Sequence, residues 1–533
     1  MILGEDKWLL FTGRHFWNRK CRKKTWWQQE FAVFKCEATA NSVTGHVCVN
    51  SNKYRMVWFM LFSSLVFLWY FLPAVFLLYF ITKNLHIRNG VLLAASLFFY
   101  AWGEPKYVIL MLVSIGLNYF FGLWIGRMQS KHRMRLAVTT CVFLNLLLLG
   151  YFKYFNFAVE IANSLLSRFA GGAYTLSFRE IALPVGISFY TFQALSYVVD
   201  VYRGTIQAQK NIFHLALYIS FFPQLIAGPI VKYHDVCEQI GNRQCTAEGM
   251  AYGIKRFSYG LAKKMLFANT FAATVDWMME KPLAQLGTVN AWMLAVLYTL
   301  QIYFDFSGYS DMAIGLGKMF GFDFMENFNY PYISTSIREF WRRWHISLST
   351  WFREYLYIPL GGNRKGQVRT YINLLIVFFA TGLWHGAGAT FIIWGLYHGL
   401  FLVVERMGLG KLLEKNCFRG LNHIYTALVV VVGWVFFRAD TLADAKVILH
   451  QMFTWENGIY PASLFVNRKV IFLAVLGVLL SGIVQSICPK LREHLYEKEV
   501  TKTVDIVIMA VLLFLCTMYL VSSTYNPFIY FRF

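Results

Sequence analysis

Two histidines lie in places where an ionisable side chain costs free energy to bury, which suggests that they serve a function. His385 lies between two apolar stretches, residues 371–383 and 390–404, that have the character of membrane-embedded segments. An ionisable group at membrane depth needs a polar partner or a water-filled path, so it marks a functional site by default. His345 lies upstream, in a basic and aromatic stretch. A neutral imidazole can take the proton of a hydroxyl that attacks a thioester or ester, or it can relay protons in a transporter.

The composition indicates an integral membrane protein with several spans. Of the 533 residues, 57% are hydrophobic, 18% are aromatic and only 15% are charged, whereas a soluble domain carries about 25% charged residues. The apolar segments are residues 57–82, 90–103, 106–126, 136–156, 180–201, 211–230, 288–320, 370–383, 389–404, 424–438, 470–487 and 503–523. The sequence predicts an all-α polytopic protein with about 11–12 membrane-embedded helices, the shorter ones being half-helices or re-entrant segments.

The net charge of +22, from 50 Lys and Arg against 28 Asp and Glu, fits this class. The basic residues lie in short loops beside apolar segments, which is typical of the cytoplasmic loops of membrane proteins and not of a nucleic-acid-binding domain. The nine cysteines are scattered, and the closest pair, Cys237 and Cys245, lacks the spacing of a zinc site. We expect no nucleic-acid partner, no metal site and no tightly bound cofactor.

Residues 1–55 differ from the rest of the chain. They carry a basic run from Arg19 to Lys24 and lack the apolar core of a signal peptide. We expect them to be a disordered basic arm or the product of a wrongly assigned start, with the natural start at or shortly after Met56. Residues 56–533 are predicted to form a single transmembrane domain.

Candidate donor-binding residues lie in residues 337–369, where Arg and Lys alternate with Trp and Tyr. Trp and Tyr at this density mark a membrane–water boundary, so the simplest interpretation is a positively charged anchor on the cytoplasmic side. The functional interpretation adds a binding face for a polyanionic donor such as coenzyme A (CoA), because guanidinium groups match phosphate geometry. The candidates in this stretch are Arg338, Trp341, Arg342, Trp344 and Arg353.

A second basic segment, residues 246–280, has the pattern of an amphipathic helix, and we predict that it lies against the cytoplasmic leaflet. Two carboxylates, Asp305 and Asp311, interrupt the apolar segment 288–320. Their separation puts them on different faces of a helix, unlike an acid–base pair. A structural role such as pairing with an arginine is the simplest interpretation, although Asp305 is also a donor-binding candidate.

Two further residues are expected to support His385 without direct chemistry. Trp384 precedes it in the chain, and His398 follows it in the next apolar segment. A buried histidine that only packs between helices is the alternative interpretation for His398.

Several strings, taken in order, resemble the membrane-bound O-acyltransferase family. They are residues 184–193, 224–230, 303–311, 341–349, 357–362, 382–387 and 526–533. Within the family the chain is most similar to the membrane subunit that O-acetylates alginate and other exported polysaccharides. The resemblance runs from about residue 56 to the end of the chain.

The resemblance implies a helical bundle around a transmembrane tunnel. In it, His385 matches the catalytic histidine of the family and His345 matches its second signature position. The resemblance further implies cytoplasmic acetyl-CoA as the acyl donor and co-substrate, an exported polysaccharide as the acceptor and an extracytoplasmic SGNH-type acetyltransferase as a partner. The setting would be a bacterial cell membrane.

Four alternatives remain open, one of which is acylation of a lipid or a protein by the same chemistry. A sister branch moves D-alanine from a carrier protein to teichoic acid and shares the string 343–349, but it usually lacks the region that begins near Val435 here. A proton-coupled transporter would move protons or substrate without acyl chemistry. A non-catalytic scaffold for an export complex would tolerate the loss of both histidines.

Overall fold

The computed structural model describes residues 60–169, 176–415, 419–490, 503–522 and 525–529, and every regular element in these ranges is helical. The first half contains η2 (Phe67–Phe71), α3 (Leu72–Ile81), α4 (Leu85–Gly103), α5 (Tyr107–Arg127), α6 (Lys131–Phe169), α7 (Ile187–Arg203), α8 (Ile212–Ser220), α9 (Phe222–Leu225), α10 (Tyr233–Gly241), α11 (Ala247–Ala262), η3 (Lys263–Ala268), α12 (Asn269–Met279) and η4 (Leu283–Gln285). The second half contains α13 (Gly287–Met319), η5 (Pro331–Ile333), α14 (Ile337–Arg343), α15 (Ile346–Phe352), η6 (Arg353–Tyr357), α16 (Gln367–His385), α17 (Ala389–Val404), η7 (Glu405–Leu409), α18 (Gly410–Leu413), α19 (Arg419–Arg438), α20 (Leu442–Phe453), α21 (Ala462–Phe465), α22 (Arg468–Val478), η9 (Leu479–Ile483), α23 (Val484–Ile487) and α25 (Thr503–Ser522). Residues 1–55, which we expect to be a disordered basic arm or the product of a wrongly assigned start, lie outside the described ranges.

The all-α polytopic prediction is confirmed. Six helical stretches in the described residues are long and apolar enough to cross a membrane. They are Tyr107–Arg127, Lys131–Phe169, Ala389–Leu413, Gly420–Arg438, Arg468–Ile487 and Thr503–Ser522. The stretch Phe67–Ile81 is apolar but shorter. The protein is therefore a multi-pass membrane protein.

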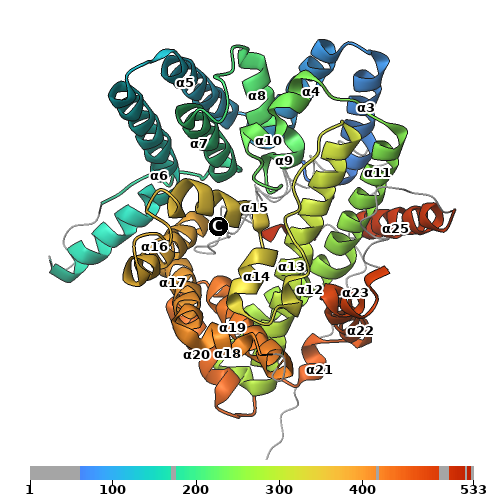
Figure 1. The fold of residues 1–533 in the computed structure, drawn as a ribbon. Helices are drawn as coiled ribbons and strands as arrows, with labels where there is room; N and C mark the ends of the chain where they lie inside the picture. The colour runs from blue at the N-terminus through green and yellow to red at the C-terminus, as the bar shows by residue number, and fades with distance from the viewer. Residues whose placement is uncertain (1–59, 170–175, 416–418, 491–502, 523–524, 530–533) are drawn as a thin grey trace, which may run out of the picture. The chain divides into compact units, whose positions relative to one another are not determined.

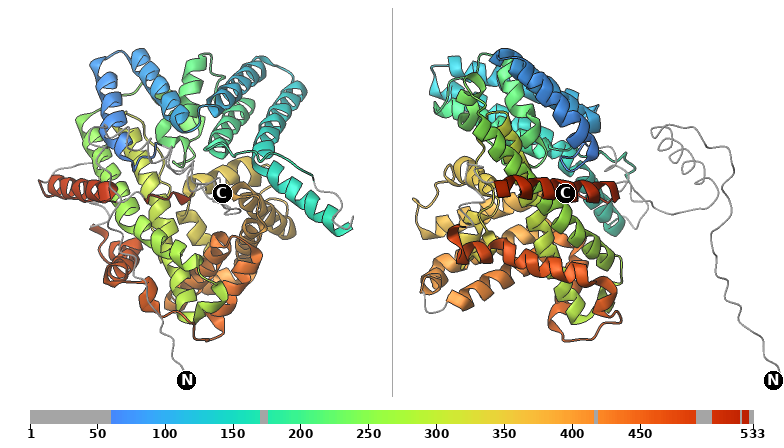
Figure 2. Two further views of the ribbon diagram at one scale, coloured as in Figure 1. Left: turned by 180° about the vertical axis from the view of Figure 1, so that it is seen from behind. Right: turned by 90° about the vertical axis from the view of Figure 1, so that its right-hand side faces the viewer.

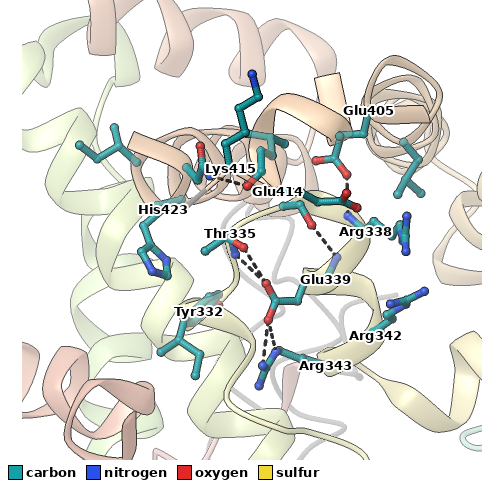
Figure 3. Close-up of a pocket in the computed structure, with 18 of the residues that line it drawn as sticks. Tyr332, Thr335, Arg338, Glu339, Arg342, Arg343, Glu405, Glu414, Lys415 and His423 are labelled. Atoms are coloured by element: carbon teal, nitrogen blue, oxygen red, sulfur yellow. Dashed lines mark hydrogen bonds and ion pairs between the residues drawn. The ribbon is translucent and has the colours of Figure 1, made fainter. Parts of the chain in front are cut away.

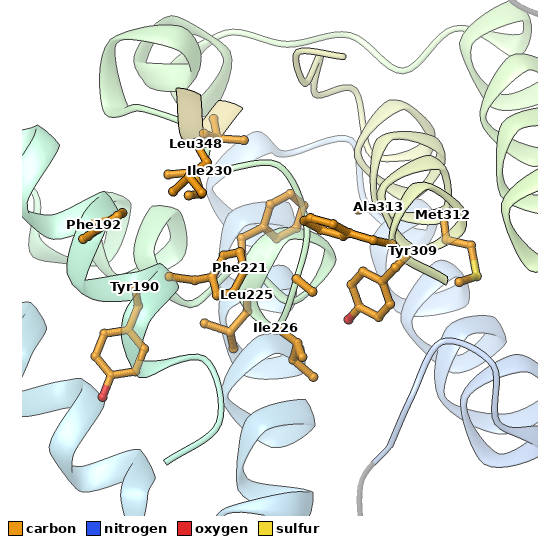
Figure 4. Packing of buried hydrophobic residues seen from close by; sticks show 14 of the residues in the cluster. Tyr190, Phe192, Phe221, Leu225, Ile226, Ile230, Tyr309, Met312, Ala313 and Leu348 are labelled. Atoms are coloured by element: carbon orange, nitrogen blue, oxygen red, sulfur yellow. The ribbon is translucent and has the colours of Figure 1, made fainter. Parts of the chain in front are cut away.

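The apolar segment 211–230 forms two short helices and not a single span. Helix α8 ends at Ser220, α9 contains Pro223 near its start, and the chain continues without regular structure to residue 232. This irregular backbone is buried among Phe192, Leu348 and other apolar side chains (Figure 4). Non-helical backbone at membrane depth is tolerated where protein covers it in this way.

Helix α13 is the central element, and nearly every residue from Tyr298 to Leu316 is buried. It contacts α11, α12, α19 and α20 (Figure 1). Glycines allow the close crossing with α11, because a Cβ at Gly260 would lie 2.5 Å from the carbonyl oxygen of Gly308. On its other side, α11 contacts α25, which Figure 2 shows from two further directions.

The prediction that residues 246–280 lie against a leaflet is wrong. They form α11, η3 and α12, and Arg256 and Lys264 are only 3% and 2% exposed. Their charges face carboxylates of α13: Arg256 pairs with Asp311 at 2.7 Å and Lys264 with Asp305 at 2.7 Å. The amphipathic pattern is real, but the polar face meets protein carboxylates and not lipid headgroups. We call Arg256, Lys263, Lys264, Asp305 and Asp311 the charged seam.

The described C-terminal segment, residues 525–529, lies inside the bundle. Lys264 donates to the carbonyl oxygen of Pro527, and the backbone N–H of Ile529 donates to Asp305 Oδ2 at 2.9 Å. The ring of Phe528 stacks on Tyr309 with 4.7 Å between centroids. Asp305 thus holds both a buried cation and the end of a distant segment.

Candidate active site

His385 is the last residue of α16 and is almost completely buried, with 8% of its surface exposed. A short turn, residues 386–388, leads directly into α17, so the imidazole lies where the two helices meet. Aromatic rings surround it: Trp394 and Phe437 each make an edge contact with 5.0 Å between centroids, and Trp384 lies at 4.8 Å. These rings exclude water and leave the imidazole in a low-dielectric setting.

Glycines permit the close approach of α16 and α17. A Cβ at Gly382 would lie 2.4 Å from the carbonyl oxygen of Phe391, and one at Gly395 would lie 2.2 Å from that of Phe378. No larger residue fits either place without moving the backbone. The glycine-rich sequence around His385 therefore fixes the packing that positions the histidine.

Two residues of α6, missed by the sequence analysis, hold the end of α16. Lys153 Nζ donates to the carbonyl oxygens of Trp384 and His385, the latter at 3.2 Å, and Tyr154 Oη donates to that of Leu383 at 2.5 Å. The last carbonyls of a helix lack partners within it and carry its partial negative charge, so a cation is well placed there. A lysine within the apolar segment 136–156 was the available signal.

His345 has a strained backbone. It precedes α15 with φ = 46° and ψ = 55°, in the left-handed region that residues other than glycine rarely adopt. Strain of this kind persists only where the surroundings enforce it, and it is concentrated at functional sites. Asn327 is the enforcing residue: its backbone oxygen accepts from the N–H of Ile346 at 2.9 Å, and its side chain contacts His345 and Ser347.

The hydrogen bonds around Asn327 determine which ring nitrogen of the neutral His345 carries the proton. Asn327 Nδ2 donates to Ser310 Oγ at 3.0 Å, while Oδ1 accepts from the N–H and the hydroxyl of Ser347 at 3.2 Å and 2.9 Å. His345 Nδ1 lies 3.0 Å from the same Oδ1. A carbonyl oxygen can only accept, so Nδ1 carries the proton and the lone pair of the neutral ring is on Nε2. Asn327 was not among the sequence candidates.

The two histidines flank a common aromatic wall. The ring of Trp384 lies 4.8 Å from that of His385 and 6.2 Å from that of His345, measured between centroids. A small pocket opens beside His385 and is lined by Ile302, Phe306, Trp344, His385, Trp394, Trp434, Phe437 and Ile529. Phe306 also contacts the ring of His345 at 4.6 Å. We call this pocket, together with His345 and Trp384, the histidine pocket.

A second cavity, of about 1650 Å³, is lined by basic side chains (Figure 3). The cations on its walls are Arg338, Arg342, Arg343, Arg406, Lys411 and Lys415, and the anions are Glu339, Glu405 and Glu414. We call this cavity the basic vestibule. Its walls come from η5 and α14, from the stretch between the end of α17 and the start of α19, and from η9 and α23, so the predicted stretch 337–369 supplies only part of the lining.

Two arginines of the basic vestibule are available to a ligand. Glu339 binds Arg343 at 2.8 Å and accepts from Thr335. Burial alone would raise the pKa of Glu339, but these hydrogen bonds and the Arg343 charge outweigh it and lower that pKa. The guanidinium groups of Arg338 and Arg342 are exposed and form no hydrogen bond or ion pair with the described residues. They can therefore bind an incoming anion (Figure 3).

The remaining sequence candidates lie in different places. Trp344 lines the histidine pocket, and Trp341 is buried against His398 with 5.2 Å between ring centroids. Arg353 is exposed on η6 and does not line the basic vestibule. Asp305 belongs to the charged seam. Among the described residues, no group of three or more His, Cys, Asp or Glu side chains is arranged to hold a metal ion.

Comparison with known proteins decides the family. The sequence model of the membrane-bound O-acyltransferase family matches residues 209–443, which include both histidines. The chain is 46% identical over 404 residues to the probable alginate O-acetylase AlgI of Pseudomonas aeruginosa, an alignment that covers 74% of this chain and 76% of that protein. The chain belongs to the membrane-bound O-acyltransferase family. It is accordingly an O-acyltransferase, and the resemblance inferred from its motifs is confirmed.

Two other relatives show the breadth of this similarity. The peptidoglycan O-acetyltransferase of Helicobacter pylori is 36% identical to this O-acyltransferase over 527 residues, covering 90% of this chain and 98% of that protein. The teichoic acid D-alanyltransferase of Bacillus subtilis is 27% identical over 348 residues, covering 60% of this chain and 87% of that protein.

Proposed function

We propose that this O-acyltransferase takes an acetyl group from cytoplasmic acetyl-CoA and passes it, through the histidine pocket, toward O-acetylation of an exported polysaccharide. The observation that carries the proposal is the pairing of a buried histidine pocket with a basic vestibule whose Arg338 and Arg342 are exposed. Guanidinium groups bind phosphates in fixed geometry, and the nucleotide end of CoA is rich in phosphate. Relatives named as acetylating alginate or peptidoglycan support acetyl as the acyl group.

In the proposed reaction, a hydroxyl oxygen attacks the thioester carbonyl carbon while His385 takes the hydroxyl proton. The new C–O bond forms, the C–S bond breaks, and the proton passes from His385 to the departing thiolate, so that CoA leaves as the thiol. His345, whose Nε2 is the acceptor nitrogen, accepts a hydrogen bond from a second polar hydrogen of the acceptor and so orients it, since the single proton of the attacking hydroxyl goes to His385. The aromatic walls exclude water, which limits hydrolysis of the thioester.

The proposal also includes the membrane, the partner protein and the orientation of the basic vestibule. A bacterial inner membrane is the setting that agrees with the relatives, and an extracytoplasmic SGNH-type acetyltransferase is the partner we propose to deliver the acetyl group to the polysaccharide. The basic vestibule would then face the cytoplasm, in keeping with the distribution of positive charge in membrane proteins.

A radiolabel experiment tests the donor and the direction of transfer. Purified protein is placed in proteoliposomes with acetyl-labelled CoA on the vestibule side, and label is followed to an acceptor polymer on the opposite side, with and without an SGNH-type partner. Wild type should transfer label and His385→Ala should not. If folded wild type moves no label in either case, the acetyl-CoA proposal is wrong.

D-alanyl transfer is the second candidate, because the chain is similar to a teichoic acid D-alanyltransferase. The same vesicles, supplied with a D-alanyl carrier protein in place of acetyl-CoA, distinguish the two. Transfer from the carrier protein alone would favour this second function.

A further inference from the structure

The turn between α5 and α6 carries several positive charges that have no counterion within the hairpin. Arg127 ends α5, and Lys131, Arg133 and Arg135 lie in the first two turns of α6. All four residues are exposed, and none forms a hydrogen bond or ion pair with a described residue. Residues 105–159 contain no Asp or Glu. The two helices, which lie side by side (Figure 1), therefore supply no carboxylate to neutralise these cations.

A neighbouring turn adds a fifth cation. Tyr119 Oη donates to the carbonyl oxygen of Lys210 at 2.7 Å, and a Cβ at Gly126 would lie 2.8 Å from that of Ala208. The loop that follows α7 is therefore packed against the end of α5, and its Lys210 is exposed. This loop also lacks acidic residues, since residues 201–234 contain no Asp or Glu. We call Arg127, Lys131, Arg133, Arg135 and Lys210 the basic tip.

The exposed apolar residues of both helices place the basic tip at the surface of the membrane. Helices α5 and α6 are both long and apolar enough to cross a bilayer. On α5, Phe120 and Trp124 are exposed one turn apart, and Arg127 follows within a further turn on the same face. Trp marks the membrane–water boundary, so Arg127 lies at the depth of the lipid headgroups. On α6 the exposed Leu136 comes directly after the last cation.

The arrangement of the cations around α6 favours lipid over a protein partner. At 100° per residue, Lys131 and Arg135 share one side of the helix, whereas Arg133 lies on the opposite side. A folded acidic protein would contact one side of such a helix and leave the other cation without a partner. Lipid headgroups surround a helix end and can reach every side of it.

We propose that the basic tip binds the phosphate groups of anionic phospholipids. The guanidinium and ammonium groups donate charge-assisted hydrogen bonds to the phosphate oxygens. Each Lys or Arg close to an anionic membrane surface raises the affinity for it by about fivefold. The bound lipids hold the hairpin of α5 and α6 at a fixed depth in the bilayer. Lipid binding at the basic tip is independent of the acyl donor and of the catalytic chemistry.

Fluorescence quenching of Trp124 by brominated lipids tests the basic tip, because this indole lies at its edge. The full-length protein is placed in vesicles of phosphatidylcholine that contain either brominated phosphatidylglycerol or brominated phosphatidylcholine. The contribution of Trp124 is the difference between each protein and the same protein with Trp124→Phe. The ratio of the two association constants measures the local preference for the anionic lipid.

Three variants are compared with wild type, and each is first shown to keep the wild-type Tm. The neutral variant combines Arg127→Gln, Lys131→Gln, Arg133→Gln and Arg135→Gln. The charge-keeping variant replaces the three arginines with lysine. Lys106→Gln, at the other end of α5, removes an exposed cation that does not belong to the basic tip.

Wild type, the charge-keeping variant and Lys106→Gln should prefer phosphatidylglycerol at Trp124 by about fivefold or more. The neutral variant should bind the two lipids about equally. No preference in wild type, or the same preference in wild type and the neutral variant, would overturn the proposal. A preference that disappears in inorganic phosphate but persists in chloride of the same ionic strength would assign the site to free phosphate, and would overturn the lipid as its ligand.

Discussion

The charged seam and the histidine pocket both place polar groups deep in an apolar protein, but they satisfy them in opposite ways. In the charged seam each carboxylate of α13 meets a cation, as Asp311 meets Arg256 and Lys263 at 2.7 Å and 2.5 Å. In the histidine pocket the imidazole rings of His345 and His385 are packed against aromatic side chains, and Asn327 contacts one nitrogen of His345. Charges that neutralise each other hold helices together, whereas a neutral base with a lone pair can act on a substrate.

The largest expected effect is at His385. Replacing it with alanine removes the proposed base and should lower the rate of thiol release from acetyl-CoA by about 10³-fold, while yield and size-exclusion profile stay those of wild type. The rate is measured per folded protein in proteoliposomes. A residual rate within tenfold of wild type would mean that the base is elsewhere.

The next effect concerns the orientation of His345. Asn327→Leu removes the oxygen that accepts from His345 Nδ1 and should slow turnover by about 10²-fold, because the ring can then adopt the wrong tautomer. Asn327→Asp keeps an acceptor at the same place and should recover part of the rate. Equal rates for the two variants would contradict a role for that acceptor.

Lys153 should give a smaller effect, since it acts on His385 only through the end of α16. Lys153→Met removes the donor to the carbonyl oxygens of Trp384 and His385 and should lower kcat by about tenfold with little change in KM. Lys153→Arg keeps a cation and should restore part of kcat. A change confined to KM would argue that the residue affects donor binding and not the position of the histidine.

The charged seam should give the smallest effect on chemistry and a clear effect on stability. Asp311→Asn leaves Arg256 with an incomplete set of partners and should destabilise the protein by about 3 kcal/mol, seen as a lower Tm in detergent. The rate per folded protein should stay within about twofold of wild type. A normal Tm with a large loss of rate would place Asp311 in the catalytic machinery.

The helical class was predicted from the sequence and is confirmed, whereas the catalytic role of His385 stays a prediction; both rest on local features of the sequence. Long apolar segments report spans directly, and an ionisable residue between two of them stands out. The buried position of residues 246–280 could not be predicted, since an amphipathic pattern looks the same whether its cations face lipid or the carboxylates of another helix. Only the fold shows that Asp311 supplies that face.

Non-local partners account for the rest of what was missed. Asn327 is separated from His345 by a turn and a short helix, and nothing in its neighbourhood suggests a contact with the histidine. Lys153 lies more than 200 residues before the carbonyls that it binds. A lysine within an apolar segment was a visible signal, but its partner could be named only from the packing of α6 against the end of α16.

The most direct test of the account is a side-by-side measurement of thiol release from acetyl-CoA by wild type, His385→Ala and Asp311→Asn, each normalised to folded protein in proteoliposomes. The account predicts background release with His385→Ala and near wild-type release with Asp311→Asn. Comparable rates for the two variants, or a greater loss with Asp311→Asn, would contradict the assignment of the chemistry to the histidine pocket.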